Sequence, residues 1–334
     1  MPLLALVAVE GALRAFGFEH PLDPPPYEFL APDRRLASDD GPTVTDPDLF
    51  WRLRPGAHTP DGSMSVAASG FRTAFDEQKS PNVRRVLCLG DSSTFGLHVR
   101  ESEAWPARLE AALAPEVEVL NLGVPGYTSH QGRTLLAKVG DTLAPDDVVI
   151  AFGAFNDWVP ARGRIDAEQQ TPPLWRQARI VQLGARILGT GAPTNTSSSG
   201  AETLSVLGEI RTADFDGRRR VPLEHFERDL RALLERSAAL GARTVIVSQP
   251  LPCKTAARNP VAHAYAAAAR RVAAASQARY VDGWRIFDES GLPESALFVD
   301  FCHPSHAGHA LLAAEIATAL TREPATRMTA VSGR

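Results

Sequence analysis

The sequence predicts an α/β sandwich built on a parallel sheet, and two observations support this prediction. From about Pro81 onward, short apolar runs alternate with longer segments of helical periodicity, which is the pattern of strand–helix–strand units. The runs are continuous rather than alternating, as expected of parallel strands that are buried on both faces. We therefore expect functional groups in the loops that follow the strands, at the carboxyl edge of the sheet.

Each element is expected from its local pattern. Five strands are expected, at residues 83–90, 116–123, 146–153, 244–250 and 278–284. Helices are expected at residues 102–114 and 129–140, between Pro222 and Gly241, after the Asn259–Pro260 pair, and from about Pro304 to Leu320. The apolar spacing of three and four residues supports the helices, and Gly241 provides a C-terminal stop.

Three regions depart from this alternation. Residues 1–80 consist of a hydrophobic segment and a Pro-rich arm of short extended pieces. Residues 159–221 form an insertion long enough to be a lid, with a Ser- and Gly-rich loop at 189–202. Residues 323–334 are expected to be a disordered tail. The remaining span, residues 81–322, is the expected core domain.

The hydrophobic N-terminal segment has two interpretations. Its apolar run, Pro2 to Val9, is shorter than the roughly 20 residues that span a bilayer. It also lacks the basic region and cleavage site of a standard signal peptide. The segment is either an amphipathic arm on the domain or the end of a membrane anchor. Membrane association and location (cell envelope, secreted or cytoplasmic) therefore stay open.

Composition excludes several classes of function. The formal net charge of −4 and a pI near 6.2 leave no basic surface for nucleic acid, and the run "DGRRR" at 216–220 is interpreted as a solvated loop. The three cysteines lack metal-like spacing and imply no disulfide framework. Neither a metal nor another cofactor is expected. The oligomeric state is not determined.

The loops after the strands carry a possible nucleophile and its base. Ser92 follows the first strand, in the stretch "GDSS". Of the nine histidines, only His303 has an aspartate three residues earlier, Asp300. Asp300 would fix the imidazole tautomer, and His303 would take the proton of Ser92. Donors for an oxyanion would be the backbone N–H groups of Ser92 and Gly126 and the side-chain amide of Asn156.

These residues lie in four short blocks, "GDSS" at 90–93, "NLGVPGYTSHQG" at 121–132, "GAFND" at 153–157 and "DFCHP" at 300–304. The order of the blocks resembles that of the SGNH (GDSL) hydrolase superfamily. The resemblance implies a serine nucleophile at Ser92, oxyanion donors at Gly126 and Asn156, and an Asp300–His303 pair. It also implies a three-layer α/β/α, flavodoxin-like fold with one five-stranded parallel sheet.

The blocks depart from the family pattern at two places. Ser93 stands where many relatives have leucine, and one residue more than usual separates Gly153 from Asn156. The second departure bears on the position of Asn156 within its loop.

The expected function is ester hydrolysis through an acyl-enzyme, on a small-molecule, glycan or lipid ester. Two alternatives stay open: an O-acyltransferase with the same triad, or a non-catalytic glycan-binding module. Trp158 and Arg162 are expected to contact substrate. A metal site at Asp300, His303, His306 and His309 is disfavoured, because side chains spaced by three on a helix do not converge on one ion.

Overall fold

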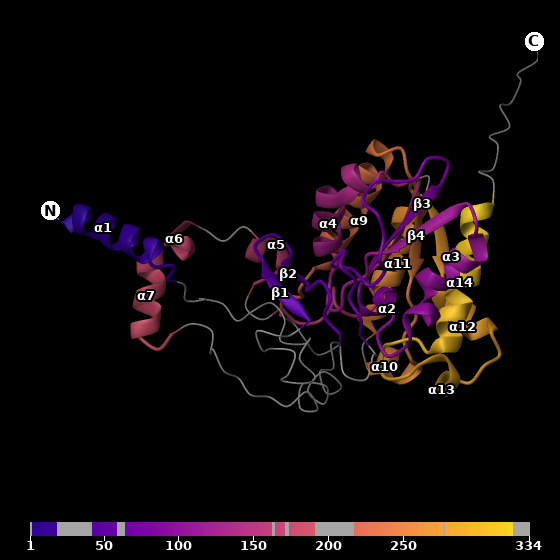
Figure 1. Ribbon diagram of the computed structural model, residues 1–334. Coiled ribbons are helices and arrows are strands. Elements are labelled where there is room, and N and C mark those ends of the chain that lie inside the picture. The colour runs from indigo at the N-terminus through magenta and orange to yellow at the C-terminus, as the bar shows by residue number, and fades with distance from the viewer. Residues whose placement is uncertain are drawn as a thin grey trace, which may run out of the picture.

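The computed structural model describes residues 2–18, 42–58, 64–161, 164–170, 174–190, 217–258, 260–276 and 278–322 (Figure 1). Arg162, Asn259, most of the Ser- and Gly-rich loop and the tail from residue 323 lie outside these residues.

A five-stranded parallel sheet forms the centre of the molecule. Its strands are β3 (Arg84–Gly90), β4 (Val117–Asn121), β5 (Asp147–Ala151), β6 (Arg243–Ser248) and β7 (Arg279–Asp282), in the order β4-β3-β5-β6-β7. The strand order reverses at β3, where the first βα loop begins. This reversal is where ligand sites form in open α/β sheets. All five expected strands are confirmed.

Helices cover both faces of the sheet. The principal ones are α3 (Trp105–Leu113), α4 (Ser129–Leu143), α9 (Leu223–Ala239), α11 (Val261–Ala274), α12 (Gly283–Glu289) and α14 (His306–Thr321), joined by the short α2 (Ser92–Phe95), η2 (Glu101–Glu103), α10 (Cys253–Arg258) and α13 (Glu294–Leu297). Figure 1 shows α4, α9 and α11 on one side of the sheet and α3, α12 and α14 on the other. Two separate apolar cores, one on each face, confirm the three-layer architecture.

The Pro-rich arm packs against the same core as the sheet. Its strands β1 (Thr43–Asp46) and β2 (Phe50–Leu53) form an antiparallel pair. Trp51 and Leu53 are buried in the core on the α4 side, and the hydroxyl of Tyr127 donates to the carbonyl of Trp51 at 2.7 Å. The arm is thereby tied to the loop that follows β4.

Helices from the N-terminal segment and the insertion lie beside one another, away from the sandwich (Figure 1). They are α1 (Pro2–Ala15), α6 (Leu174–Gln177) and α7 (Arg179–Ile187). A further insertion helix, α5 (Asp166–Gln170), lies near β1 and β2 instead. Among the described residues, none of the helices combines the length and apolar character needed to cross a bilayer.

Candidate active site

Ser92 occupies the first turn after β3. Asp91 caps the following helix α2, and its Oδ1 accepts from the backbone N–H of Ser93 at 2.9 Å. Gly90 is required at the end of the strand, because a Cβ there would meet Oγ1 of Thr94 at 1.9 Å and the carbonyl oxygen of Ala151 at 2.8 Å. Ser93 is buried with 5% of its surface exposed, whereas Ser92 is partly exposed. Of the two serines, Ser92 is the accessible one.

His303 reaches Ser92 from the loop before α14. Its Nε2 lies 2.8 Å from Oγ of Ser92, across a separation of 211 residues. Its Nδ1 lies 2.7 Å from Oδ2 of Asp300. The other carboxylate oxygen of Asp300 accepts from the backbone N–H groups of Cys302 and His303, at 2.9 and 2.8 Å. The three side chains therefore form one continuous hydrogen-bonded chain.

Asp300 is held as a carboxylate. Burial opposes its ionisation, but the hydrogen bond and charge of His303 and the two backbone N–H groups together lower the pKa of Asp300 to about 2. A carboxylate at Nδ1 makes that nitrogen the N–H donor. Nε2 then carries a lone pair and accepts the hydroxyl proton of Ser92. This tautomer is the one in which an imidazole can act as a base toward a serine.

The loops after β4 and β5 meet this first loop. Asn156, after β5, donates from Nδ2 to Oδ2 of Asp91 at 3.0 Å. Val124, after β4, donates its backbone N–H to the carbonyl of Gly90 at 3.1 Å. Gly126 follows with φ of 81°, a left-handed conformation that glycine adopts readily. The extra residue between Gly153 and Asn156 does not prevent Asn156 from reaching the nucleophile loop.

Comparison with known proteins decides the family. The family model for GDSL-like lipases and acylhydrolases matches residues 88–213 and 215–311, most of the chain. The chain belongs to the GDSL-like lipase/acylhydrolase family. This membership confirms the resemblance of its four blocks to the SGNH (GDSL) hydrolases.

Individual relatives are distant. Thioesterase 1/protease 1/lysophospholipase L1 of Escherichia coli is 26% identical over 141 residues, which is 42% of this chain and 65% of the relative. The alignment thus spans a little less than two thirds of that curated relative. The structure of Axe2, an acetylxylan esterase from Geobacillus stearothermophilus, is 20% identical, covering 72% of this chain and 95% of Axe2 with a TM-score of 0.46. That of LAE5, an alpha/beta hydrolase from the metagenome of Lake Arreo, is 20% identical, covering 72% of this chain and 97% of LAE5 with a TM-score of 0.47.

In this GDSL-family chain, Asp157 braces the loop after β5. Its carboxylate accepts from the backbone N–H of Gly153 at 3.0 Å and from both the backbone N–H and the hydroxyl of Ser129, at 2.8 and 2.6 Å. Complete burial outweighs these hydrogen bonds and raises the pKa of Asp157 to about 7. Asp157 therefore fixes the loop that carries Asn156 to the start of α4.

Arg220 is a site-supporting residue that sequence reasoning missed. The run that contains it was expected to be a solvated loop, which is wrong for Arg220, since only 2% of its surface is exposed. Its guanidinium donates to the carbonyl of Gly126 at 2.9 Å, to Oε1 of Gln131 at 3.1 Å and to both carboxylate oxygens of Asp166. No local pattern marks one arginine of three as buried, because its partners come from distant segments.

Of the two expected substrate residues, Trp158 is the one that the structure describes. Arg162 lies outside the described residues. Trp158 is 1% exposed, and its indole N–H donates to the carbonyl of Ala154 at 2.7 Å. The expectation that Trp158 contacts substrate is corrected by this burial. The indole fills the core beneath the loop after β5, against Phe155.

The two histidines after His303 have unrelated surroundings. His306 has 63% of its side chain exposed and lies 3.3 Å from the carboxylate of Glu103. His309 is fully buried, and its Nδ1 accepts from the backbone N–H of Trp105 at 3.2 Å. Cys302, next to His303, is buried, and burial raises the pKa of its thiol. It therefore stays protonated and packs as a small apolar group.

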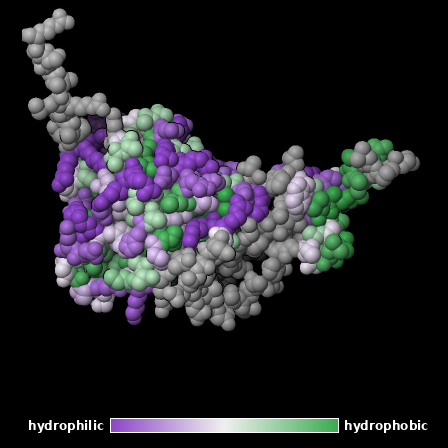
Figure 2. Space-filling model, turned by 180° about the vertical axis from the view of Figure 1, so that it is seen from behind, coloured by the Kyte–Doolittle hydropathy of each residue, from purple (hydrophilic) through white to green (hydrophobic). Residues whose placement is uncertain are grey.

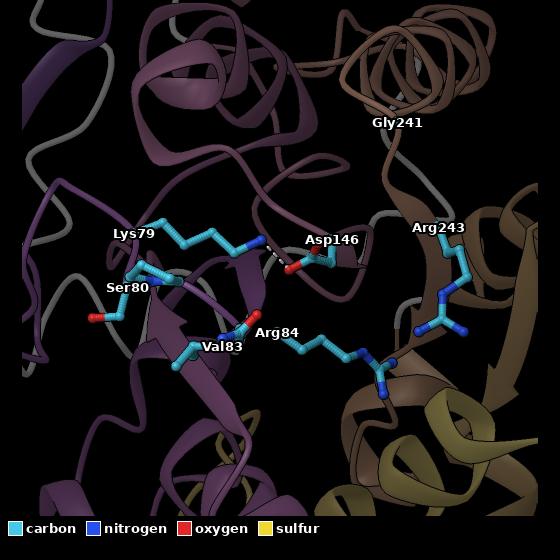
Figure 3. Close-up of a pocket in the computed structure, with 9 residues that line it drawn as sticks. Lys79, Ser80, Val83, Arg84, Asp146, Gly241 and Arg243 are labelled. Carbon is cyan, nitrogen blue, oxygen red and sulfur yellow. Dashed lines mark hydrogen bonds and ion pairs between the residues drawn. The ribbon is translucent and has the colours of Figure 1, made fainter.

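A cavity of about 800 Å³ lies at the opposite edge of the sheet, by the amino ends of β3 and β6. Its lining includes Lys79, Arg84, Asp146 and Arg243, and Figure 3 shows the Lys79 ammonium directed at the Asp146 carboxylate. Arg84 and Arg243 both pair with the buried Asp147. These charged groups form ion pairs with one another and link the amino ends of the strands. They lie at the edge of the sheet opposite to Ser92.

Proposed function

We propose that this protein hydrolyses carboxylic esters through an acyl-enzyme on Ser92. Oγ of Ser92 attacks the carbonyl carbon while its proton passes to Nε2 of His303. The tetrahedral intermediate then collapses, the ester C–O bond breaks, and His303 returns the proton to the departing alcohol. Water attacks the acyl-serine in the same way and releases the acid. The observation that carries the proposal is the 2.8 Å contact between Ser92 and His303.

Asp300 and the three loop donors complete the proposed mechanism. Asp300 stabilises the imidazolium that forms when His303 holds the proton. The backbone N–H groups of Ser92 and Gly126 and the amide of Asn156 would receive the negative charge on the carbonyl oxygen. Such donors act most strongly because they are in place before the charge develops.

The direct test is hydrolysis of a short p-nitrophenyl ester by the wild type, Ser92→Ala and Ser93→Ala. Ser92→Ala is expected to remove nearly all activity and the acyl-enzyme burst, whereas Ser93→Ala is expected to keep both. Equal activity of Ser92→Ala and wild type would contradict the proposal. A fluorophosphonate probe should label the wild type and not Ser92→Ala, and lack of labelling would favour a non-catalytic glycan-binding module.

The substrate class is proposed as acyl esters of lipids or glycans. The named relatives include a thioesterase/lysophospholipase and an acetylxylan esterase, and the family as a whole acts on acyl esters. Rates on a series of p-nitrophenyl esters from acetate to palmitate, and on acetylated oligosaccharides, would distinguish lipid esters from glycan esters as the substrate. Adding an oligosaccharide acceptor tests transfer, since acyl-glycan formed in excess of free acid would favour an acyltransferase.

We also propose that the helix pair of α1 and α7 rests on a lipid surface. Among the described residues, ten large apolar side chains are exposed, and eight of them belong to this end of the molecule: Leu4, Leu6, Val7, Val9, Phe16, Trp175, Ile187 and Leu188. Figure 2 shows the same concentration as a hydrophobic tip projecting from an otherwise mixed surface. Apolar exposure of this extent marks an interaction site.

The distribution of these side chains around α1 favours lipid over a protein groove. At about 100° per residue, Leu6, Val7 and Val9 point at roughly 200°, 300° and 140° from Leu4. Exposed apolar groups thus occur all around the helix, whereas a protein groove covers one face. The adjoining charges are mainly basic, since Arg14, Arg179 and Arg186 accompany Glu10. Basic residues beside an apolar helix suit an anionic membrane surface.

Vesicle co-sedimentation tests this contact. The full chain is expected to bind phosphatidylcholine vesicles weakly, and vesicles containing phosphatidylglycerol more strongly at low salt. Leu4→Glu/Val7→Glu should lose at least about tenfold in binding, since each change places a charge in the apolar interface. Leu292→Glu, at a 44% exposed position on the main body, is the matched control and should bind as wild type. No vesicle binding by the wild type, or self-association through α1 instead, would contradict the proposal.

A further inference from the structure

A second imidazole, that of His98, lies beside the Asp300–His303 pair. Nε2 of His98 is 3.5 Å from Oδ2 of Asp300, and its ring lies edge-to-face against the ring of His303 with centroids 5.1 Å apart. Neither the four blocks nor the proposed ester hydrolysis gives His98 a role. Its presence at the carboxylate therefore needs its own explanation.

The backbone holds His98 at this place firmly. His98 has φ of 69°, a left-handed conformation that is uncommon for residues other than glycine. The buried Arg72 donates to the carbonyls of Gly96 and Val99, on either side of His98, both at 2.7 Å. The guanidinium also lies 4.4 Å from the ring centroid of Phe95. Sparsely populated conformations of this kind persist where the surrounding structure fixes them, and they cluster at functional sites.

The three side chains lie close enough together to converge on one metal ion after small side-chain movements. One ligand atom from each of His98, Asp300 and His303 can be chosen so that all lie within 4.8 Å of one another. Ligand distances of about 2.0–2.2 Å in a tetrahedral site place ligand atoms roughly 3.3–3.6 Å apart. The His98–Asp300 contact already has this separation. The Asp300–His303 contact must open slightly, which is what exchange of a shared proton for a metal ion requires.

The donor set selects the type of cation. Two imidazoles and one carboxylate suit zinc and neighbouring transition metals, whereas magnesium and calcium prefer oxygen ligands. We propose that His98, Asp300 and His303 form an inhibitory binding site for a divalent transition-metal ion of the zinc type. With three protein ligands, a fourth position stays open to water.

Inhibition follows from the tautomer of His303. In the resting protein, Nδ1 carries the proton and Nε2 faces Ser92 with its lone pair. A metal ion on Nδ1 needs the lone pair there, so the proton moves to Nε2. His303 then presents an N–H donor to Ser92 and has no lone pair with which to take the hydroxyl proton. The proton stays on the ring, and no other reactant is consumed. This consequence rests on the proposed ester hydrolysis, whereas the binding itself does not.

The experiment measures binding and inhibition separately on the full chain. Zinc binding is followed by competition with a chromogenic chelator, and inhibition by the rate on a short p-nitrophenyl ester at buffered free zinc. The wild type is expected to bind one zinc ion, to lose its activity in parallel, and to recover with EDTA. Magnesium at the same concentrations should neither bind nor inhibit.

Variants at His98 locate the site. His98→Asn and His98→Gly both suit the left-handed backbone, and either should weaken zinc binding and raise the half-inhibitory concentration by about tenfold or more. Each rate is normalised to that variant's own metal-free rate, and a thermal melt verifies folding. His306→Asn removes an exposed imidazole three residues past His303 and should respond to zinc as wild type.

Three results would overturn the proposal. These are no zinc binding by the wild type, unchanged affinity in both His98 variants, and stoichiometric binding through His98 without inhibition of an active enzyme. If the chain proved inactive toward every ester, the proposed function would fail while the binding measurement still decided whether the metal site exists.

Discussion

Asp91 and Asn156, which are 65 residues apart, are joined by a hydrogen bond of 3.0 Å from the amide Nδ2 to Oδ2. The same carboxylate caps the helix that starts at Ser92, through its other oxygen. Asp91 is 3% exposed, and both of its carboxylate oxygens accept hydrogen bonds from within the protein. These contacts indicate that Asp91 braces the site and does not contact substrate. One side chain thus sets the nucleophile loop and the proposed oxyanion amide relative to each other.

Removing this link should affect kcat more than KM. Asn156→Ala is expected to lower kcat by about 10²–10³, the usual cost of an oxyanion donor. Asp91→Ala should lower kcat by about tenfold or more, because the amide loses its orientation. The double variant should be little worse than Asn156→Ala alone. Steady-state kinetics on a p-nitrophenyl ester decide this, and fully additive losses would show that Asp91 acts independently of Asn156.

Gly123 should tolerate no side chain. A Cβ there would lie 2.3 Å from the backbone nitrogen of Phe95 and 2.8 Å from the carbonyl carbon of Thr94. Gly123→Ala therefore pushes against α2 and displaces Ser92, and we expect a loss of about 1–3 kcal/mol in unfolding free energy with a larger loss of activity. Gly184→Ala has open space and is the control. Activity equal to wild type in Gly123→Ala would contradict the close packing of α2 on the loop after β4.

Arg220 should be required for stability as well as for the loop that carries Gly126. Arg220→Met leaves the fully buried carboxylate of Asp166 without its guanidinium, and breaking a buried pair in this way costs about 3–5 kcal/mol. Urea unfolding measures the loss. Arg218→Met is the neighbouring control, because its ion pair with Glu168 is exposed and is worth under about 1 kcal/mol. Similar stabilities for the two variants would refute the structural role of Arg220.

Acid should destabilise the fold through His309. Burial, followed by the charges of Arg72, His303 and Arg108, lowers the pKa of His309 from 6.5 to about 3. Between pH 6.5 and pH 3, the unfolded chain therefore binds a proton at His309 that the folded chain does not bind. The free energy of unfolding is unaffected by His309 above pH 6.5. As the pH falls from 6.5 toward 3, it decreases by up to about 1.4 kcal/mol per pH unit.

The comparison variant for this titration is His309→Asn, whose side-chain oxygen can still accept from Trp105. Unfolding free energies of wild type and variant, measured by urea at several values between pH 7 and pH 4, should show a shallower acid slope for the variant. His306→Asn, at an exposed position, should keep the slope of wild type. Identical slopes for wild type and His309→Asn would assign the acid sensitivity to other groups.

The sequence by itself determined the sheet, the face helices and three of the site's side chains. Strand patterns and cap residues are local, and the carboxyl ends of parallel strands meet at one edge, so Ser92, Asp300 and His303 could be placed together from their positions along the chain. The choice of Ser92 over Ser93 also followed from the resemblance, and the difference in exposure agrees with it.

Only the tertiary structure decided which polar side chains are buried and with which partners. Arg220, Arg72 and His98 look like ordinary surface residues in their local sequence, yet each contacts groups that come from distant segments. Trp158 was expected to contact substrate, but it lies in the core, because its burial also depends on contacts that the local sequence does not reveal. Burial and pairing depend on the closure of the whole three-layer packing, and a local pattern does not contain that information.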